Sequence, residues 1–425
     1  GTILETVYTF VYTPFGDLSA IKVGNSTLVS YTYTDNINRL PATTTFGNGQ
    51  TITYTYNDDL LLTNQSCGQT LNVSYAYDEL GNLLKTTDSI NNTVTKQAGD
   101  ETQVWNLAET SLLHSFAATD EQLKETIGGT VYTTGYSETD ATGTQNASTT
   151  VSYEGYTQTT YTDGFGRISQ IVTKSGDNVL LTQTFSYQSR TLEGQTLTTG
   201  KVASITTTTA NGQSTTESYT YDTNGNILTI SKNNTLAQKY SYDSLDRLSQ
   251  TYDYETGKSD LYSYDPGGNF SSIIHFDLAA DGTQTYTGST SPQYADSTDW
   301  PDRMTGYGGD TITYDNAGNP TSYRGATLSW QNGRELSSYV KDGATAQYVY
   351  DANGLRTKKT TAATQYTYTW ANGQLTHQAW GENNLHFYYD AQGAVIGFAY
   401  NGAMYTYVKN LQGDVTGILD SAGTV

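Results

Sequence analysis

Aromatic and polar residues alternate along most of the chain in a short pattern that returns many times. The segments Tyr219–Leu228 (YTYDTNGNIL), Tyr240–Leu248 (YSYDSLDRL) and Tyr348–Arg356 (YVYDANGLR) share the consensus Y-x-Y-D-x-x-G-N-L. Tyrosines at positions i and i+2 lie on one face of a β-strand, and the small residue between them faces the other way. The pattern therefore predicts strands, and these stretches lack the 3.6-residue period of a helix.

Most copies of the consensus also contain the residues of a tight turn. Asp at the first turn position accepts backbone N–H groups, and Gly at the fourth adopts conformations that other residues avoid. The apolar residue after the turn begins a return strand, so one repeat predicts a β-hairpin. A second turn leads into the next hairpin. Examples are Asn48-Gly49, Asn211-Gly212, Asn332-Gly333 and Asn372-Gly373.

The predicted structural residues are the aromatic, Asp and Gly positions of the clearest copies, which recur about every 20 residues. They are Tyr75, Tyr77, Asp78, Gly81, Tyr219, Tyr221, Asp222, Gly225, Tyr240, Tyr242, Asp243, Tyr262, Tyr264, Asp265, Gly268, Tyr314, Asp315, Gly318, Tyr348, Tyr350, Asp351, Gly354, Tyr389, Asp390 and Gly393. Diverged copies carry Trp at the second aromatic position, as at Trp330 and Trp370.

The repeats divide the chain into three parts. Residues 1–84 and 151–425 carry the repeat, and residues 85–150 form an irregular insertion between them. Within the insertion, Leu112, Leu113 and Phe116 lie at helical offsets in the segment Trp105–Phe116, which predicts one or two helical turns or an irregular loop.

Composition at first suggests disorder. Leu, Ile, Val and Phe number 76 of 425 residues, and the net charge is −21, a combination typical of unfolded chains. The 37 Tyr and 5 Trp supply the missing large side chains. A ribbon of about 20 hairpins is too wide to close into one filled barrel. It forms either layered sandwiches or a spiral, hollow β-shell, and tyrosine favours the shell because its hydroxyl needs a partner or water.

Charge and sequence pattern exclude several classes of function. A pI near 4.3 argues against nucleic-acid binding and against an anionic membrane surface. No apolar run approaches the length of a membrane-spanning helix. The single cysteine, Cys67, excludes an internal disulfide and a thiolate metal cage. The chain begins at Gly1 without Met, so we expect it to be a fragment from which targeting signals are missing.

No pattern in the chain predicts a catalytic, cofactor-binding or metal-binding residue. The repeat aspartates offer one carboxylate per turn, which fits turn capping better than a Ca²⁺ array. The four histidines, His114, His275, His377 and His386, have no metal-binding spacing. Ser-x-x-Lys occurs at Ser19 and Ser338 without companion motifs, which indicates chance matches. A convergent pair of carboxylates stays open as a third, enzymatic alternative.

The quoted repeats resemble the YD repeats of the RHS family, which includes bacterial polymorphic toxins, the C component of insecticidal toxin complexes and the teneurins. The segment Tyr407–Asp420 additionally resembles the opening of the RHS-associated core. The repeat region 151–425 would therefore end at the start of that core. The resemblance implies a β-sheet shell that encloses a C-terminal toxin. It does not extend to self-cleavage, because the only Asp-Pro-x-Gly motif, Asp265–Gly268, belongs to an ordinary repeat.

The leading hypothesis is therefore a non-enzymatic shell fragment of a secreted or surface-exposed bacterial toxin. We expect a monomer without cofactors, whose partner is the enclosed effector domain, and an acidic inner face that favours a basic cargo. The alternative is a cell-surface module that binds carbohydrate or mediates adhesion. In that case glycans would stack on Trp330, Trp370 or Trp380, although cross-strand packing is the favoured explanation of the repeat aromatics.

Overall fold

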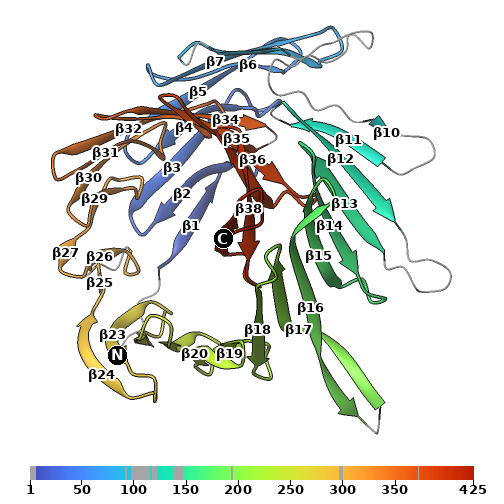
Figure 1. The fold of residues 1–425 in the computed structure, drawn as a ribbon. Coiled ribbons are helices and arrows are strands. Elements are labelled where there is room, and N and C mark those ends of the chain that lie inside the picture. The colour runs from blue at the N-terminus through green and yellow to red at the C-terminus, as the bar shows by residue number, and fades with distance from the viewer. Residues whose placement is uncertain are drawn as a thin grey trace. The chain divides into compact units, whose positions relative to one another are not determined.

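The chain folds into antiparallel β-sheets. The computed structural model describes residues 6–90, 93–96, 115–116, 122–127, 129–137, 147–192, 195–295, 300–371 and 373–425, and this part contains no helix. Strands follow one another side by side in chain order (Figure 1). The predicted all-β architecture of antiparallel hairpins is thereby confirmed.

The strands of the described residues belong to four sheets. The first contains β1 (Tyr8–Tyr12), β2 (Leu18–Val23), β3 (Ser26–Tyr33), β4 (Pro41–Phe46), β5 (Thr51–Tyr56), β6 (Leu62–Cys67), β7 (Leu71–Tyr77), β8 (Leu83–Asp88) and β9 (Thr93–Lys96). The second contains β10 (Ser115–Phe116), β11 (Gln122–Ile127), β12 (Thr130–Ser137), β13 (Ser148–Tyr153), β14 (Tyr156–Thr162), β15 (Ile168–Ser175), β16 (Asn178–Leu192), β17 (Gln195–Thr209), β18 (Ser214–Tyr221), β19 (Ile227–Lys232), β20 (Thr235–Tyr242), β21 (Leu248–Asp253), β22 (Lys258–Tyr264), β23 (Phe270–Leu278) and β24 (Gln284–Thr290).

The remaining strands form a small sheet and a large one. The small sheet contains β25 (Gln293–Tyr294), β26 (Met304–Tyr307) and β27 (Asp310–Thr311). The large sheet contains β28 (Thr313–Tyr314), β29 (Pro320–Tyr323), β30 (Ala326–Gln331), β31 (Glu335–Lys341), β32 (Ala344–Tyr350), β33 (Arg356–Thr361), β34 (Gln365–Ala371), β35 (Gln374–Trp380), β36 (Asn383–Tyr389), β37 (Val395–Tyr400), β38 (Ala403–Lys409) and β39 (Val415–Leu419).

Two kinds of turn alternate along the ribbon. At the repeat turns the register shifts at the second aromatic residue, as between Ala76 and Tyr77, and the Gly three residues after the Asp has a positive φ, for example 86° at Gly81. This is a β-bulge, which adds local twist at the end of a strand. The other turns include two-residue turns with both φ angles positive, such as Asp342-Gly343 and Asn401-Gly402. The right-handed twist of the flanking strands favours such turns.

Strands also occupy the described residues of the segment 85–150. Strand β9 and strands β11 and β12 lie within it. The predicted helical segment Trp105–Phe116 and His114 lie outside the described residues, except for Ser115 and Phe116 in β10. The proposed boundaries at residues 84 and 150 stay a prediction.

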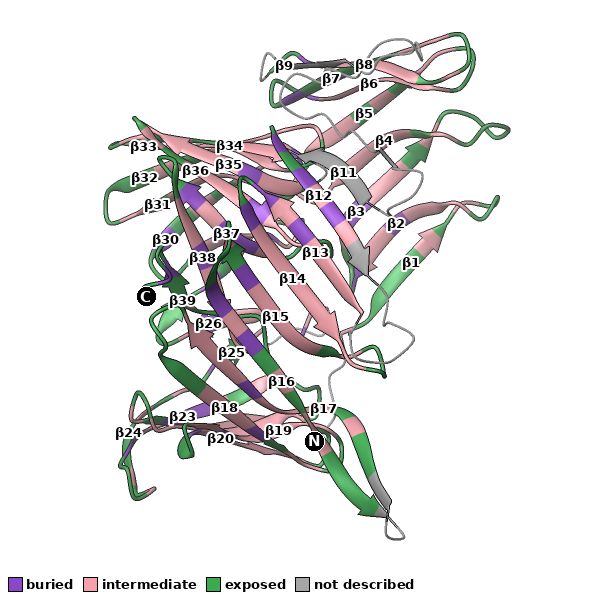
Figure 2. Cartoon of the chain, turned by 45° about the vertical axis from the view of Figure 1, so that its right-hand side comes forward, coloured by how far each residue is buried: buried purple, intermediate pink, exposed green. Residues whose placement is uncertain are grey.

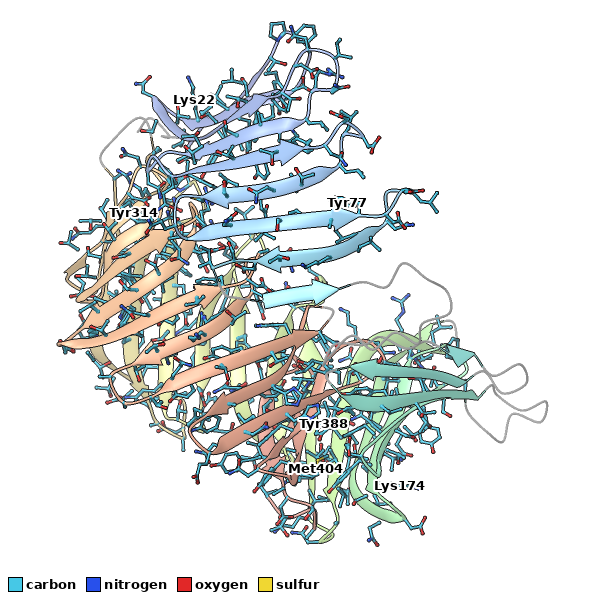
Figure 3. All side chains as sticks on the ribbon, turned by 90° about the horizontal axis from the view of Figure 1, so that it is seen from above. Lys22, Tyr77, Lys174, Tyr314, Tyr388 and Met404 are labelled. Carbon is cyan, nitrogen blue, oxygen red and sulfur yellow. The ribbon has the colours of Figure 1, made fainter. Side chains whose placement is uncertain are left out.

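The chain divides into two compact units, each assembled from separate segments. Unit 1 comprises Gly1–Ala108, Ser263–Ile273 and Thr290–Tyr368, and unit 2 comprises Glu109–Tyr262, Ile274–Ser289 and Thr369–Val425. In both, most strand residues are half-buried, and the fully buried ones are scattered along the strands (Figure 2). Side chains project from both faces of the sheets (Figure 3). Thin sheets of this kind need less aliphatic bulk than a solid core.

Candidate functional site

The repeat aspartates organise their own turns. In the turn after β7, Asp78 Oδ1 accepts the backbone N–H groups of Leu80 and Asn82, at 2.9 and 2.7 Å. Asp78 Oδ2 accepts the side-chain amide of Asn82 at 2.9 Å. These hydrogen bonds hold the pKa of the Asp78 carboxyl below its usual value, with the Asn82 side chain as the largest cause. The same pattern recurs at Asp222 with Asn226.

In most of the described repeats the second aromatic residue makes a hydrogen bond to the preceding repeat. The Tyr77 hydroxyl donates to the main-chain oxygen of Leu62, the first residue of β6, at 2.8 Å. The ladder between β6 and β7 ends at the pair Asn64–Ser74, so the Leu62 carbonyl lies beyond it. The Tyr77 hydroxyl therefore supplies a donor for the Leu62 carbonyl, which no backbone N–H of β7 reaches through the ladder. We call this contact a tyrosine latch.

The latch is repeated in both units with the same geometry. The hydroxyl-to-carbonyl pairs are Tyr33–Leu18, Tyr56–Pro41, Tyr77–Leu62, Tyr187–Ile168, Tyr221–Val202, Tyr242–Ile227, Tyr294–Phe270, Tyr314–Met304, Tyr350–Leu336 and Tyr389–Leu375. Trp330 Nε1 donates to Pro320 O in the same position, at 2.7 Å, and the Lys409 ammonium donates to Val395 O. Tyr, Trp and Lys side chains thus all donate a hydrogen bond to the equivalent main-chain carbonyl.

A polar seam closes unit 1. It consists of turn residues of the first sheet (Asn48, Gln50 and Thr70) and turn residues of the large sheet (Asp315, Asn332 and Gly333). Asn48 Nδ2 donates to Asp315 Oδ2 at 3.0 Å, and the Thr70 hydroxyl donates to Asn332 Oδ1 at 2.7 Å. The Gly333 N–H donates to Gln50 Oε1 at 2.6 Å. Segments more than 260 residues apart in sequence are joined by side-chain amides and hydroxyls.

At the polar seam, turn residues of the first sheet and of the large sheet also approach each other closely. A Cβ at Gly47 would overlap the carbonyl oxygen of Asn316, and a Cβ at Gly333 would overlap the ring of Phe46. Glu335 lies beside the seam, where its Oε2 accepts the Asn332 amide at 2.8 Å. Burial raises the pKa of the Glu335 carboxyl despite that hydrogen bond.

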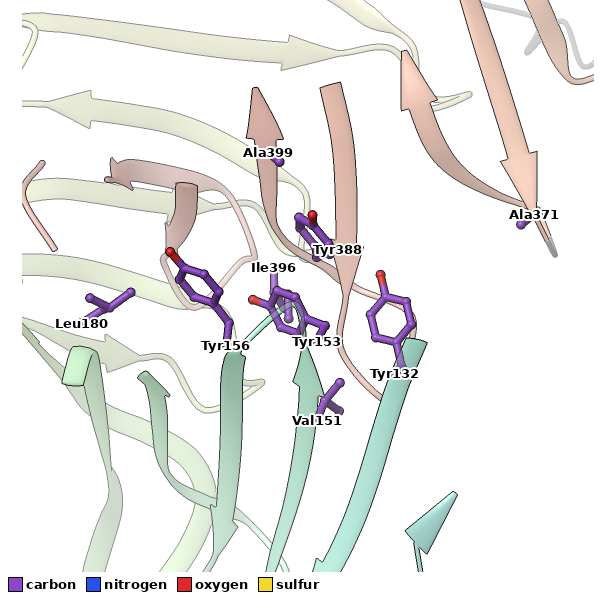
Figure 4. Close-up of a cluster of buried hydrophobic side chains, with 9 residues drawn as sticks. All are labelled: Tyr132, Val151, Tyr153, Tyr156, Leu180, Ala371, Tyr388, Ile396 and Ala399. Atoms are coloured by element: carbon purple, nitrogen blue, oxygen red, sulfur yellow. The ribbon is translucent and has the colours of Figure 1, made fainter. Parts of the chain in front are cut away.

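An aromatic seam closes unit 2. It consists of Tyr132 on β12, Tyr153 on β13, and His386 and Tyr388 on β36 (Figure 4 shows its tyrosines). The rings of Tyr153 and Tyr388 stack at 4.8 Å between centroids, and each residue is only 3% exposed. Burial raises the pKa of Tyr388 to about 12. The second sheet and the large sheet meet here through rings rather than through amides.

A pair of histidines borders the aromatic seam. His377 on β35 and His386 on β36 are cross-strand partners, and their ring centroids lie 4.0 Å apart. His386 Nε2 lies 2.9 Å from the hydroxyl oxygen of Thr130, a fully buried residue at the start of β12. Burial, and then the charge of His377, lowers the pKa of His386 to about 4.

The predicted residues occupy equivalent places in the hairpins. The second Tyr of each quoted copy is the last residue of its strand, and the Asp follows directly. The tryptophans weighed as glycan platforms are half-buried. Trp330 is a latch residue, Trp380 stacks on Tyr400 at 6.1 Å between ring centroids, and Trp370 lies next to buried Ala371. Glycan stacking on these residues stays a prediction.

Other chemistry is sparse in the described part of the chain. Its His, Cys, Asp and Glu residues form no cluster of three or more that could hold a metal ion. Cys67 is a buried free thiol, and burial raises its pKa. Among these residues no helix is long and apolar enough to cross a membrane.

Comparisons with known proteins define the fold. No family model matches the chain. A crystal structure of TcdB2–TccC3 matches 98% of this chain and 24% of that chain, with a TM-score of 0.66 and 17% identity. The Photorhabdus luminescens Tc holotoxin pore matches 99% of this chain and 25% of that one, with a TM-score of 0.63 and 17% identity. The chain thus spans about a quarter of the length of these structures.

A curated protein is similar in sequence to part of the chain. The tRNA3(Ser)-specific nuclease WapA of Bacillus spizizenii is 29% identical over 177 residues, which cover 40% of this chain and 7% of WapA. Sheet order, bulged turns and latches define the class of the chain, an antiparallel YD-repeat β-protein. Its fold is that of the RHS/YD shells of Tc toxins, which confirms the resemblance predicted from the repeats.

Proposed function

We propose that this chain is a wall segment of an RHS/YD shell that encloses an effector domain of a bacterial polymorphic toxin. The observation that carries the proposal is the match of nearly the whole chain to about a quarter of a Tc toxin chain. A ribbon in which consecutive strands pair within each sheet suits a wall, because it covers area without a solid core. Secretion or surface exposure, a monomeric state and a structural rather than catalytic role belong to the same proposal.

The chemistry of the wall supports enclosure. The latches and both seams use the aromatic and amide side chains for holding strands and turns together. The repeat carboxylates accept hydrogen bonds from their own turns. The nuclease activity in the name of WapA suggests one class of effector, an enzyme that acts on tRNA. An acidic face toward a basic cargo stays a prediction.

Protease protection of the full-length gene product tests enclosure. If the proposal is right, the effector region resists a protease concentration that digests the same region expressed alone. A variant with a broken seam, such as Tyr388→Ala, should lose this protection, whereas Tyr286→Ala, at a 62% exposed position, should keep it. Equal digestion of the effector region with and without this chain would contradict the proposal.

A further inference from the structure

The histidine pair at the aromatic seam has a role that enclosure alone does not require. Thr130 is fully buried and belongs to β12, whereas His386 belongs to β36 of another sheet of unit 2. Their side-chain contact of 2.9 Å therefore joins two sheets. His386 also stacks on Tyr388 at 4.7 Å between centroids, which in turn stacks on Tyr153. One imidazole thus connects the polar and the aromatic contacts of this seam.

The surroundings of His386 make its charged form costly. The neighbouring ring is His377, at 4.0 Å between centroids, so two imidazolium ions would face each other across the strands. From β37 the cross-strand partner is Ala399, which is buried and apolar. From β12 and β13 the ionisable neighbours are Tyr132 and Tyr153, which are neutral in acid. The carboxylate of Glu154 acts on Tyr388 of the seam.

We propose that the aromatic seam is an acid-sensitive closure, in which protonation of the His377–His386 pair separates β12 from β35 and β36. In the neutral form the pair stacks, and His386 holds Thr130. In the charged form the two rings repel, and hydration of His386 requires the seam to open. Protonation is a simple uptake of one proton per ring from solvent, and no bond to carbon changes.

The pH window follows from the direction of the shift. The folded-state pKa of His386 is depressed to about 4, below its ordinary value near 6.5. The unfolded or opened state therefore binds more protons between these values, and closure weakens as the pH falls from about 6.5 toward 4. Glu335 lies beside the polar seam of unit 1, and its raised pKa gives the opposite sign. Acid should accordingly loosen the closure of unit 2 but not that of unit 1.

Hydrogen exchange followed by mass spectrometry tests the inference on the 425-residue chain. Exchange is compared at pH 7.5 and 4.5, after correction for the intrinsic pH dependence of amide exchange. Peptides from β12 and β36 should lose at least about tenfold in protection at pH 4.5, since each unit of pKa difference corresponds to a factor of ten. Peptides from β5 and β31, in unit 1, should show no such loss.

Variants assign the effect to the histidine pair. His386→Gln keeps a polar partner for Thr130 but cannot titrate, and should abolish the acid response of β12 and β36. His377→Gln should reduce it. His275→Gln is the matched control, because His275 is a partly exposed histidine of unit 2 paired with Asp260 at 2.7 Å, and should leave the response unchanged.

Two results would overturn the inference. One is an acid response of β12 and β36 that is the same in the wild type and in His386→Gln. The other is a loss of protection that is equal in the two units. Where His386→Gln fails to fold, an NMR titration of the wild-type histidines gives the same decision, because the inference requires the pKa of His386 to lie well below the ordinary value near 6.5. Enclosure is tested separately on the full-length product, so either proposal can fail alone.

Discussion

The two units use the same hairpins but close by different chemistry. In unit 1 the closing contacts are hydrogen bonds between turns, with Asn48, Asn332 and Gly333 at the centre. In unit 2 they are stacked rings on strand faces, with Tyr153 and Tyr388 at the centre. Hydrogen bonds depend on close, directional fit, whereas ring packing depends on buried area. The repeat therefore fixes the ribbon, and side chains outside the consensus fix how the ribbon closes.

Removal of a central ring should be the most severe change. Tyr388→Ala deletes a 3% exposed aromatic side chain and should lower the free energy of unfolding of unit 2 by about 3–5 kcal/mol. Urea denaturation monitored by tyrosine and tryptophan fluorescence measures the loss. The control is Tyr286→Ala, which removes a ring that is 62% exposed. Equal losses in the two variants would show that the seam does not stabilise unit 2.

A methyl group in the polar seam should be the next most severe change. Gly47→Ala places a Cβ against the carbonyl oxygen of Asn316, so the turns must move apart at a cost of about 1–3 kcal/mol. Gly288→Ala is the control, because a Cβ there meets nothing within 4 Å. Hydrogen exchange of β4 and β5 reports the change. If Gly47→Ala exchanges like the wild type, the close approach of the turns is not needed for closure.

The latches should contribute equally in the two units, unlike the seams. Tyr77→Phe in unit 1 and Tyr242→Phe in unit 2 each remove one hydroxyl donor, and each should cost about 1 kcal/mol. Thermal denaturation of the two single variants and of the double variant measures this. The two effects should add, because the latches share no partners. A large difference between the two costs would mean that the latch depends on its unit.

The smallest expected effect is a gain in the stability of unit 1 that depends on pH. Glu335→Gln removes a carboxyl whose pKa burial raises, so unit 1 should gain less than about 1 kcal/mol at pH 7. The gain should shrink as the pH falls, because wild-type Glu335 becomes protonated and loses its penalty. Stability curves at pH 7 and pH 5 give the comparison. A gain that grows in acid would contradict the assigned role of Glu335.

The repetitive part of the structure follows from the sequence, because its causes are local. A strand end, an Asp, a Gly and a return strand lie within ten residues, so the hairpins and their order were predictable. The latch was only half predictable. Tyrosine needs a hydrogen-bond partner, but its acceptor is known only once the end of the ladder between β6 and β7 is known.

The seams could not be predicted, because their causes are not local. In Phe387-Tyr388-Tyr389 the middle residue packs into the seam and the last makes the latch, although all three residues are aromatic. The pairing of Asn48 with Asp315 joins residues 267 apart, and no pattern in either turn names its partner. The sequence shows only that His386 has no metal-binding spacing, and its neighbours Thr130 and His377 distinguish it in the structure alone.

The strict neighbour order of the strands limits how such a chain can change in length. Because adjacent strands are antiparallel, loss of one strand would reverse the direction of every strand after it and move each latch to the wrong edge. Loss or gain of a complete hairpin keeps direction, faces and latches in place. Related chains should therefore differ in length by whole repeats. Such changes should be absent where the turns meet in the seams, because these turns must keep their partners.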